Sequence, residues 1–315
     1  MSKKVVLLFP GQGAQYVGMG EKLKCTEQEK FLKQADEALG FELSKIMLEG
    51  PEDQLMQTEY TQPAIFTYSV ALLEQLKPIL EEKGLEVHSV LGHSVGEYAA
   101  LYAAGVISFE DGVRLVNQRG KFMQEAVPVG KGKMLAVLKV PQDVIEKGCE
   151  EISKTHGSVM PANYNEPGQI VISGEAAAID EFPKWLEANH SDPHRTVELK
   201  VSAPFHSALM EPAAENMKSF IDGLDFKPAQ CPYIANIDAT IYDKGTEPNI
   251  VKENLIKQIA GSVRWTQSIQ KLPTDVTCLE VGPGRVLMGL QRKIIRDIPV
   301  ISMDKDGSFD QVKEL

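Results

Sequence analysis

The hexapeptide GHSVGE, which begins at Gly92, constrains the fold more than any other stretch of the chain. An apolar run over 87–91 precedes it and a helix-forming run over 98–104 follows it. A serine between two glycines at a strand-to-helix turn is typical of a nucleophile elbow, which raises the serine hydroxyl to the edge of a sheet. Glycines suit this sharp turn because the helix must pack close to the strand. The motif therefore predicts an α/β fold with Ser94 as nucleophile; the alternative is a glycine-rich turn with an incidental serine.

Strand-like and helix-like segments alternate from the first residues onward. The continuous apolar stretch Val5–Phe9 is typical of a strand buried in a parallel sheet, and a tight loop, PGQGAQ, follows it. Pro63 is expected in the first turn of a long helix, where its missing amide donor costs little. The polar tail after Asp304 is expected to be frayed. Further strands are expected at 87–91, 232–237, 276–281 and 299–302, and helices at 28–39, 43–48, 61–80, 109–125, 212–221, 250–259, 265–272 and 286–296.

The middle of the chain follows a different pattern. Strand, helix, strand, strand, helix and strand are expected in that order over 134–140, 142–155, 158–164, 169–173, 176–189 and 195–201. This βαββαβ order is typical of a ferredoxin-like unit. The sequences GKG and SAP flank it and look like crossing points. We therefore expect residues 130–201 to form a small inserted subdomain, and residues 1–129 and 202–315 to form the large one.

Composition narrows the class of protein. The chain has 315 residues, 43% hydrophobic and 24% charged, which are ordinary values for a globular enzyme. Its net charge of −11 argues against a broad nucleic-acid surface. No apolar run approaches the roughly 20 residues of a membrane helix, so we expect a cytoplasmic protein without a membrane segment. The four cysteines are scattered without paired or metal-type spacing, which indicates reduced thiols and no metal site.

A serine nucleophile needs a base, because its own hydroxyl is almost never ionised at neutral pH. His206 has the most suggestive setting, in the sequence VSAPFHS that leaves a strand for a loop, where a side chain can project into a cleft. The alternative is a loop histidine bonded to backbone. His93 adjoins Ser94, but neighbours on an elbow point apart, so we expect His93 to form pocket wall.

Six motifs together resemble one family: GQGAQ at 11–15, GHSVGE at 92–97, QRG at 118–120, NYNEPGQ at 163–169, APFH at 203–206 and EVGPG at 280–284. In this set the chain resembles the malonyl-CoA:acyl-carrier-protein transacylases of fatty acid synthesis, or of polyketide synthases whose acyltransferase is a separate protein. The resemblance implies an α/β-hydrolase-like subdomain with a parallel sheet and an inserted ferredoxin-like subdomain. It also implies malonyl transfer from malonyl-CoA to a carrier protein's phosphopantetheine thiol through an acyl-serine, with no cofactor.

The resemblance implies a role for each matching residue. Ser94 would attack the malonyl thioester, and His206 would take its proton and return one to the leaving thiolate. The backbone carbonyl of Gln258 would orient the histidine in place of an acid. The backbone amides of Gln12 and Val95 would form the oxyanion hole. Without the resemblance, Gln12 could equally be an ordinary turn residue of this loop.

Substrate choice would rest on the residues that line the acyl pocket. Arg119 would hold the malonyl carboxylate through a planar guanidinium, although a lone arginine on a helix is more often a solvated charge. Phe205 would exclude an α-methyl group, and it favours slightly a polyketide context. Met123 and Asn163 match positions that line this pocket, and structural packing is the competing interpretation for both.

An acidic carrier protein would need a local basic surface on this acidic chain. For each basic residue named below, the alternative interpretation is a charged side chain that simply faces solvent. We expect the protein to be a monomer. Two candidate positions, Lys131 and Lys133, border the expected crossing between the subdomains. Four more lie in one late helical region, Arg285, Arg292, Lys293 and Arg296, of which 285, 292 and 296 would share one helix face.

Three rival functions fit part of the same pattern. An editing hydrolase that removes acyl groups from carrier proteins would be favoured by loss of Arg119, which is present. A non-catalytic scaffold that binds carrier proteins is opposed by the intact set of Ser94, His206, Gln12 and Arg119. A generic serine esterase would need neither the arginine nor the inserted subdomain.

Overall fold

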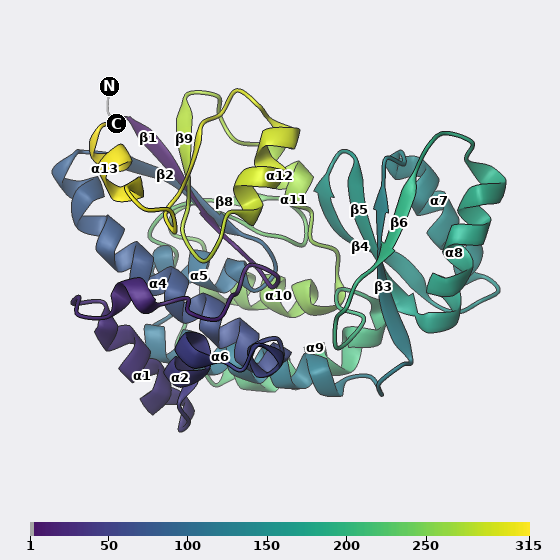
Figure 1. Cartoon of the computed structure of the whole chain (residues 1–315), viewed down its shortest axis with the longest axis horizontal. Helices are drawn as coiled ribbons and strands as arrows, with labels where there is room; N and C mark the ends of the chain where they lie inside the picture. The colour runs from purple at the N-terminus through teal and green to yellow at the C-terminus, as the bar shows by residue number, and fades with distance from the viewer. Residues whose placement is uncertain (1–2) are drawn as a thin grey trace.

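A six-stranded sheet forms the centre of the larger part of the molecule, as the computed structural model of residues 3–315 shows (Figure 1). Its order is β10-β9-β1-β2-β7-β8, and all neighbours are parallel except the last pair. The sequence pattern does not predict β8, because a strand of two residues carries no periodic signal. The strands are β1 (Lys4–Phe9), β2 (Glu86–Gly92), β7 (Tyr233–Ile234), β8 (Ile241–Tyr242), β9 (Val276–Glu280) and β10 (Val300–Ser302).

Helices cover both faces of this sheet, which explains why β1 is apolar throughout. Val5, Leu7 and Phe9 point into one core, and Val6 and Leu8 point into another. This alternation follows from the two-residue period of a strand. On the first face lie α1 (Glu29–Leu39), α2 (Leu43–Glu49), α4 (Thr58–Glu82), α5 (Gly96–Ala103), α6 (Phe109–Glu125), α9 (Glu211–Asp222) and α10 (Pro248–Ala260); on the second lie α11 (Trp265–Gln270) and α12 (Val286–Ile294).

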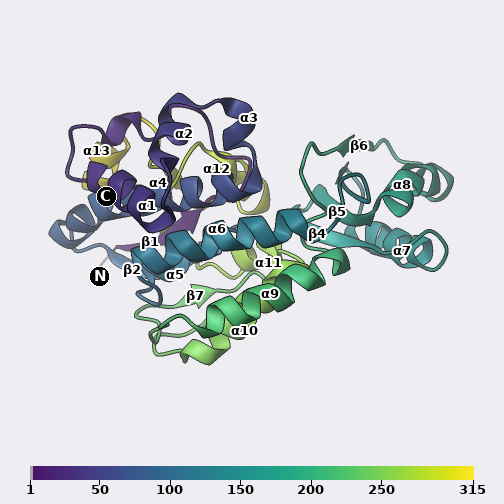
Figure 2. The same ribbon diagram turned by 90° about the horizontal axis from the view of Figure 1, so that it is seen from below.

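A separate four-stranded antiparallel sheet lies at one end of the molecule (Figure 2). Its order β4-β5-β3-β6, with two helices in the βαββαβ connection, is that of a ferredoxin-like unit. It has a core of its own, which includes Val137, Ile172 and Phe182. Its elements are β3 (Gly132–Leu138), α7 (Gln142–Ser153), β4 (Val159–Glu166), β5 (Gln169–Glu175), α8 (Ala176–Asn189) and β6 (Arg195–Glu198).

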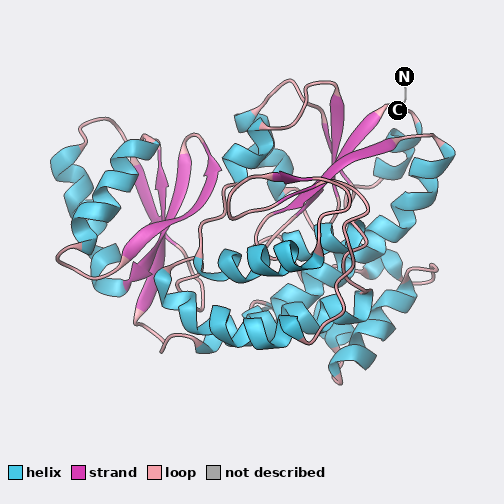
Figure 3. Ribbon diagram, turned by 180° about the vertical axis from the view of Figure 1, so that it is seen from behind, coloured by secondary structure: helices cyan, strands magenta, loops and turns pink. Residues whose placement is uncertain are grey.

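Backbone hydrogen bonds join the small sheet to the larger part of the molecule, and Figure 3 shows the two sheets side by side. The amide of Tyr164 donates to the carbonyl of Val263 over 2.9 Å, and the amide of Val263 donates to the carbonyl of Ala162 over 2.8 Å. The hydroxyl of Ser262 adds a bond of 2.7 Å to the carbonyl of Pro161. Strand β4 is thereby held against the segment that leads into α11, and this contact brings Asn163 to the junction of the two parts.

The start of α4 differs from the sequence prediction. The helix begins at Thr58, so Pro63 lies inside it and not in its first turn. Pro63 has no amide to donate to the carbonyl of Glu59 four residues earlier. The side chain of Asn117 on α6 supplies that missing donor, with its Nδ2 at 2.8 Å from the Glu59 carbonyl oxygen. A partner from a distant helix therefore stabilises a proline position that local rules disfavour.

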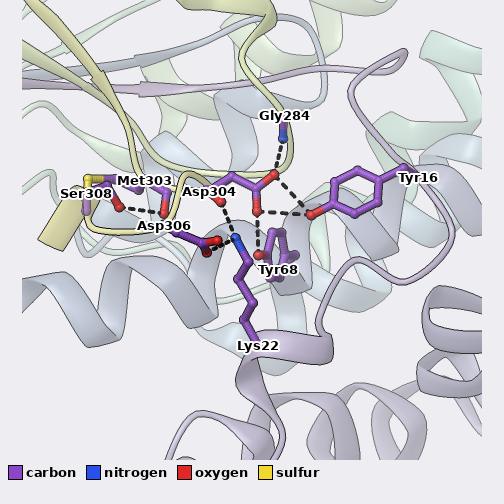
Figure 4. A network of polar contacts seen from close by, with 8 residues as sticks. All are labelled: Tyr16, Lys22, Tyr68, Gly284, Met303, Asp304, Asp306 and Ser308. Carbon is purple, nitrogen blue, oxygen red and sulfur yellow. Dashed lines mark hydrogen bonds and ion pairs between the residues drawn. The ribbon is translucent and has the colours of Figure 1, made fainter.

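The C-terminal tail is ordered, and the expectation of a frayed tail was wrong. Residues Ser308–Lys313 form α13, and Val312 is fully buried. Just before this helix, the carboxylate of Asp304 accepts hydrogen bonds from the hydroxyl of Tyr68 at 2.7 Å and from the amide of Gly284 at 2.7 Å (Figure 4). The polar composition of the tail is misleading because these partners lie far away in the sequence.

Two further contacts fasten this tail to the loop that follows β1. The hydroxyl of Tyr16 lies 3.0 Å from both carboxylate oxygens of Asp304. Lys22 reaches the carbonyl of Asp304 at 2.6 Å and pairs with Asp306 at 2.8 Å. The loop between β1 and α1 therefore rests on the C-terminal segment, as Figure 4 shows.

Candidate active site

Ser94 stands at a strained turn between β2 and α5. Its φ of 51° lies in the left-handed region that residues with a side chain rarely adopt. The two glycines of the motif make this turn sterically feasible. A Cβ on Gly92 would lie 2.0 Å from the carbonyl carbon of Gly96, and a Cβ on Gly96 would lie 2.1 Å from the carbonyl oxygen of Phe9. The turn has the form of a nucleophile elbow at the carboxyl end of the central strands.

His206 lies next to the serine, on the loop that follows the small sheet. Its Nε2 is 2.7 Å from the hydroxyl oxygen of Ser94. Its Nδ1 lies 2.9 Å from the carbonyl of Gln258 and 3.1 Å from the carbonyl of Gly261. Because carbonyls only accept hydrogen bonds, Nδ1 carries the hydrogen and Nε2 is left to accept the serine proton. Two backbone carbonyls therefore occupy the place that an acid holds in a Ser-His-Asp triad.

The imidazole of His206 is neutral in the free site. Burial, and next the positive charge of Arg119, lower the pKa of His206 to about 3. An ordinary histidine would be partly protonated near neutral pH and could not then accept a proton. The site thus holds its base in the form that deprotonation of Ser94 requires.

Arg119 extends from α6 beneath the serine and is 1% exposed. Its Nη2 lies 3.1 Å from the hydroxyl of Ser94 and 2.9 Å from Oε1 of Gln258, and its Nη1 lies 2.8 Å from Oε1 of Gln62. The guanidinium carbon is 5.4 Å from the ring centre of Tyr98. Within residues 3–315 no carboxylate forms an ion pair with this guanidinium. A buried cation whose hydrogen-bond partners are all neutral is available for direct contact with an anionic ligand.

Two amide side chains hold the backbone of the elbow. Nε2 of Gln258 donates to the carbonyl of Ser94 at 2.9 Å. Asn236 accepts from the amide of Ser94 at 2.7 Å and donates to the carbonyl of Gly92 at 2.7 Å. Neither Asn236 nor Gln62 was identified from the sequence. Asn236 lies two residues after the end of β7, near the carboxyl end of the expected strand 232–237, and this position was the only signal for it in the sequence. The sequence gives no signal for Gln62, which lies within a helix.

The amides of Gln12 and Val95 lie on adjoining segments next to the serine. A Cβ on Gly11 would be 2.4 Å from the carbonyl oxygen of His93, so the loop after β1 lies directly against the elbow. Val95 immediately precedes α5, whose N-terminal end favours negative charge. Neither backbone amide donates a hydrogen bond to another group in the part of the chain that the structure describes. Both amides can therefore bind an oxyanion.

A cavity of about 120 Å³ opens beside the serine, between the two sheets. Every catalytic or acyl-binding candidate from the sequence lines it except Gln258. The side chain of Gln258 instead bonds to the backbone of Ser94 and to Arg119. Residues of the segment 130–201 supply much of its apolar surface. The lining consists of Gln12, Gln62, His93, Ser94, Val95, Arg119, Met123, Met134, Asn163, Leu199, Val201, Phe205 and His206.

The remaining pocket residues are held by packing and a few polar contacts. His93 turns away from the reacting pair and places Nε2 at 2.8 Å from Oδ1 of Asn165. Its ring packs on Trp265, with centres 5.6 Å apart. Phe205 is buried beside His206, and Met123 places its sulfur 3.9 Å from Nε2 of Gln62. These residues shape the cavity and do not contact the serine hydroxyl through hydrogen bonds.

The basic residues proposed for partner binding fall into separate groups. Lys133 pairs with Asp180 and Glu198, and Lys293 pairs with Glu166. Helix α12 ends at Ile294, so the expectation that positions 285, 292 and 296 share one helix face was wrong. Instead, the chain turns after α12. The lining of a second cavity, of about 260 Å³, includes Arg285, Arg292 and Lys305.

Comparison with known proteins gives a consistent result. Residues 6–303 match the family model described as "Acyl transferase domain". The chain is 41% identical over 311 residues to the malonyl CoA-acyl carrier protein transacylase of Bacillus subtilis, covering 98% of this chain and 95% of that protein. The solved transacylase of Coxiella burnetii superposes with a TM-score of 0.92 at 33% identity, covering 100% and 98%. A malonyl-transacylase solved in complex with its type II polyketide synthase carrier protein superposes with a TM-score of 0.90 at 35% identity, covering 99% of each chain.

Proposed function

We propose that Ser94 and His206 carry out the reaction of this chain, which belongs to the malonyl-CoA:acyl-carrier-protein transacylase family. The reaction transfers a malonyl group from the thiol of coenzyme A to the thiol of an acyl carrier protein. One observation carries the proposal. The hydroxyl of Ser94 lies 2.7 Å from Nε2 of His206 and 3.1 Å from Nη2 of Arg119. A nucleophile thus adjoins both a neutral base and a buried cation, which suits an acyl group that ends in a carboxylate.

The first half-reaction moves the malonyl group onto the enzyme. Nε2 of His206 takes the proton of Ser94 as the serine oxygen bonds to the thioester carbon. The carbonyl oxygen becomes an oxyanion, which the amides of Gln12 and Val95 stabilise. Collapse of this intermediate breaks the carbon–sulfur bond, and the sulfur leaves with the proton from His206. The products are malonyl-Ser94 and coenzyme A.

The second half-reaction is the same sequence with a different thiol. His206 takes the proton of the carrier protein's phosphopantetheine thiol, and the sulfur attacks the malonyl ester. Ser94 leaves as the alkoxide and receives the proton back. The largely apolar lining of the cavity would limit water at the ester between the two steps, which favours transfer over hydrolysis.

Arg119 gives the site its preference for a carboxylate. In the free site the guanidinium bonds to Ser94, Gln62 and Gln258, all of them neutral. A malonyl carboxylate supplies a negative charge that bonds directly to the guanidinium in a buried setting, where a charge-assisted bidentate pair is strong. It also offsets the positive charge that helps to lower the pKa of His206. Malonyl binding therefore strengthens the base, whereas a neutral acyl group does not.

The other cavity residues would set the shape of the acyl site. Phe205 lies beside the base, where its ring would collide with an α-methyl substituent. Met123, His93 and Asn163 line the remaining space. We assign them to the acyl-binding wall and not to proton transfer. Both fatty acid and polyketide synthesis use the malonyl unit that such a pocket would accept.

The carrier protein reaches this site from outside the cavity. We propose that its acidic surface docks on the basic cavity that includes Arg285, Arg292 and Lys305. Charge reversal at Arg292 should raise the KM for carrier protein and leave malonyl loading unchanged. A slower first half-reaction in that variant would contradict the docking assignment.

The two sheets support a division of the chain into two subdomains. We propose residues 1–129 and 202–315 as the acyltransferase subdomain and residues 130–201 as the inserted subdomain. Its own apolar core supports this division. In residues 3–315 no helix combines the length and the apolar character needed to cross a membrane. A monomeric, cytoplasmic enzyme remains our prediction.

Intact mass spectrometry tests the nucleophile. Wild-type protein mixed with malonyl-CoA should gain one malonyl group, and the Ser94→Ala variant should gain none. Acetyl-CoA and methylmalonyl-CoA should load weakly. Release of free malonate without an adduct would point to a hydrolase, and neither adduct nor release would leave only a binding role.

A further inference from the structure

Glu97 is a buried carboxyl group with no part in the steps above. It lies on α5 one turn after Ser94 and is 1% exposed. Its Oε2 accepts a hydrogen bond from Nε2 of Gln258 at 2.7 Å and one from the backbone amide of Asn236 at 3.3 Å. Burying a carboxylate costs free energy unless its partners compensate, so these contacts call for a physical explanation.

The contact with Gln258 decides which way that amide faces. An ionised carboxylate only accepts hydrogen bonds, so the NH₂ group of Gln258 must point toward Glu97. The same nitrogen then donates to the carbonyl of Ser94 at 2.9 Å. Oε1 is left to accept from Nη2 of Arg119 at 2.9 Å. One carboxylate therefore orients a side chain that contacts both the nucleophile and the cation.

The contact between Glu97 and the backbone amide of Asn236 also supports the turn at Ser94. The Asn236 backbone rests on Glu97, and its side chain bonds both to the amide of Ser94 and to the carbonyl of Gly92. Both side chains that hold the elbow backbone thus depend on Glu97. A change at this carboxyl group reaches Ser94 through two routes.

The charges around Glu97 are few. Arg119 on α6 is positive and favours the ionised carboxylate, whereas Asp238 after β7 is negative and opposes it. The phenols of Tyr98, Tyr233 and Tyr242 face it from α5, β7 and β8 and are neutral near pH 7. Burial, only partly offset by these hydrogen bonds and by Arg119, raises the pKa of Glu97 to about 7. Arg119 is therefore the partner whose charge matters most to this carboxylate.

We propose that Glu97 is a positioning residue that also balances the charge of Arg119, and that malonyl loading causes Glu97 to bind a proton. The inference rests on the proposed function, because it requires a malonyl carboxylate at Arg119. That second carboxylate takes over the balance of the cation and repels the charge of Glu97. An acetyl group brings no charge, so it leaves Glu97 ionised.

The acyl transfer itself does not interfere with a measurement of the proton that Glu97 binds. A serine hydroxyl and a thioester become an ester and a thiol, so acyl transfer consumes and releases no net proton. Hydrolysis of the thioester would release a proton and change the signal in the opposite direction. Net proton uptake at loading therefore reports a group in the protein.

The test follows proton uptake with an indicator dye in weak buffer at about pH 7.5, while mass spectrometry counts acyl groups on Ser94. We expect roughly half a proton per malonyl group in wild-type protein and none per acetyl group at matched loading. The Glu97→Gln variant, whose amide oxygen can still accept from Gln258, should load malonyl without proton uptake. Its fold is checked by its melting temperature.

Glu280 offers a matched control. It is also fully buried, and burial also raises its pKa to about 7, but it accepts hydrogen bonds from the amides of Leu287 and Met288, and the charge of Arg119 is not among those that act on it. Glu280→Gln should keep the wild-type proton uptake. Loaded wild-type protein without uptake, equal uptake with acetyl, or unchanged uptake in Glu97→Gln would overturn the inference. Absence of any acyl group on Ser94 would instead refute the proposed function.

Discussion

The two sides of the active-site cavity come from different parts of the molecule and differ in chemistry. The polar side, made of Ser94, His206 and Arg119, belongs to the larger sheet and its helices, and its atoms are joined by hydrogen bonds of 2.7–3.1 Å. The apolar side includes Met134 and Leu199, from the segment that carries the small sheet. It contributes shape and contact area. We propose that the polar side carries out the reaction and binds the carboxylate, whereas the apolar side limits the space for the acyl group.

Removal of the base should have the largest effect and should not depend on the acyl group. The variant His206→Ala keeps the cavity but leaves Ser94 without an acceptor for its proton. Single-turnover acylation by malonyl-CoA should fall on the order of 10³-fold or more. Acetyl transfer should fall by a similar factor. A fall confined to one donor would show that His206 acts in selection and not in proton transfer.

Removal of the Arg119 cation should slow loading from malonyl-CoA much more than loading from acetyl-CoA. The variant Arg119→Ala loses a buried partner of the malonyl carboxylate, so malonyl loading should fall about 10²- to 10³-fold. Acetyl loading needs no such partner and should change much less. Comparison of the two single-turnover rates measures this difference. Equal losses for both donors would place Arg119 in the chemistry of the ester and not in recognition of the carboxylate.

The acid limb of the pH profile should show that the polar side is buried. An exposed histidine with an ordinary pKa would be only about 3% neutral at pH 5, a loss of roughly thirtyfold. Burial lowers the pKa of His206 to about 3, so the imidazole stays neutral as the pH falls through that range. In the Glu97→Gln variant, which lacks the other buried group of the site that titrates in this range, the acylation rate at low malonyl-CoA concentration should therefore not bend near pH 6.5. A thirtyfold decline centred there would contradict a dehydrated base.

The ring of Phe205 lies where the two sides meet. Phe205→Ala should open space for an α-methyl group and improve methylmalonyl loading about tenfold relative to malonyl loading. The ratio of the two rates in competition, read by mass spectrometry, reports this change. An unchanged ratio would show that the methyl group is excluded elsewhere.

The smallest effect is expected from the apolar side itself. Met134 contacts no reacting atom through a hydrogen bond, so Met134→Ala should leave malonyl loading within about threefold of wild type. Loading of larger acyl groups should rise modestly. A loss of malonyl loading comparable to that of Arg119→Ala, in a variant with an unchanged melting temperature, would erase the distinction between the two sides.

Much of the fold and part of the site could be predicted because their signals are local. The apolar strand before the loop of Gln12, the elbow around Ser94 and the βαββαβ segment each show a pattern within a few dozen residues. The expected α/β fold with its small inserted sheet is confirmed by the relatives of known structure. The candidate catalytic and acyl-binding residues, apart from Gln258, also line one cavity.

The features that were missed depend on contacts between distant segments. Asn117 stabilises the helix around Pro63 from 58 residues away. Tyr68 and Gly284 hold Asp304 and so order a tail whose polar composition indicates fraying. The importance of Asn236 likewise appears only when β7 is placed beside β2. A single sequence lists such polar residues without showing which group each one bonds.

The most direct test of the account is a crystal structure of the malonyl-enzyme, obtained by soaking the wild-type protein with malonyl-CoA. The account predicts an ester on Ser94 with its carbonyl oxygen at the amides of Gln12 and Val95. The free carboxylate should lie within hydrogen-bond distance of the Arg119 guanidinium, in place of its contact with the serine oxygen. A carboxylate that points to solvent, or an acyl group on another residue, would contradict the central claim.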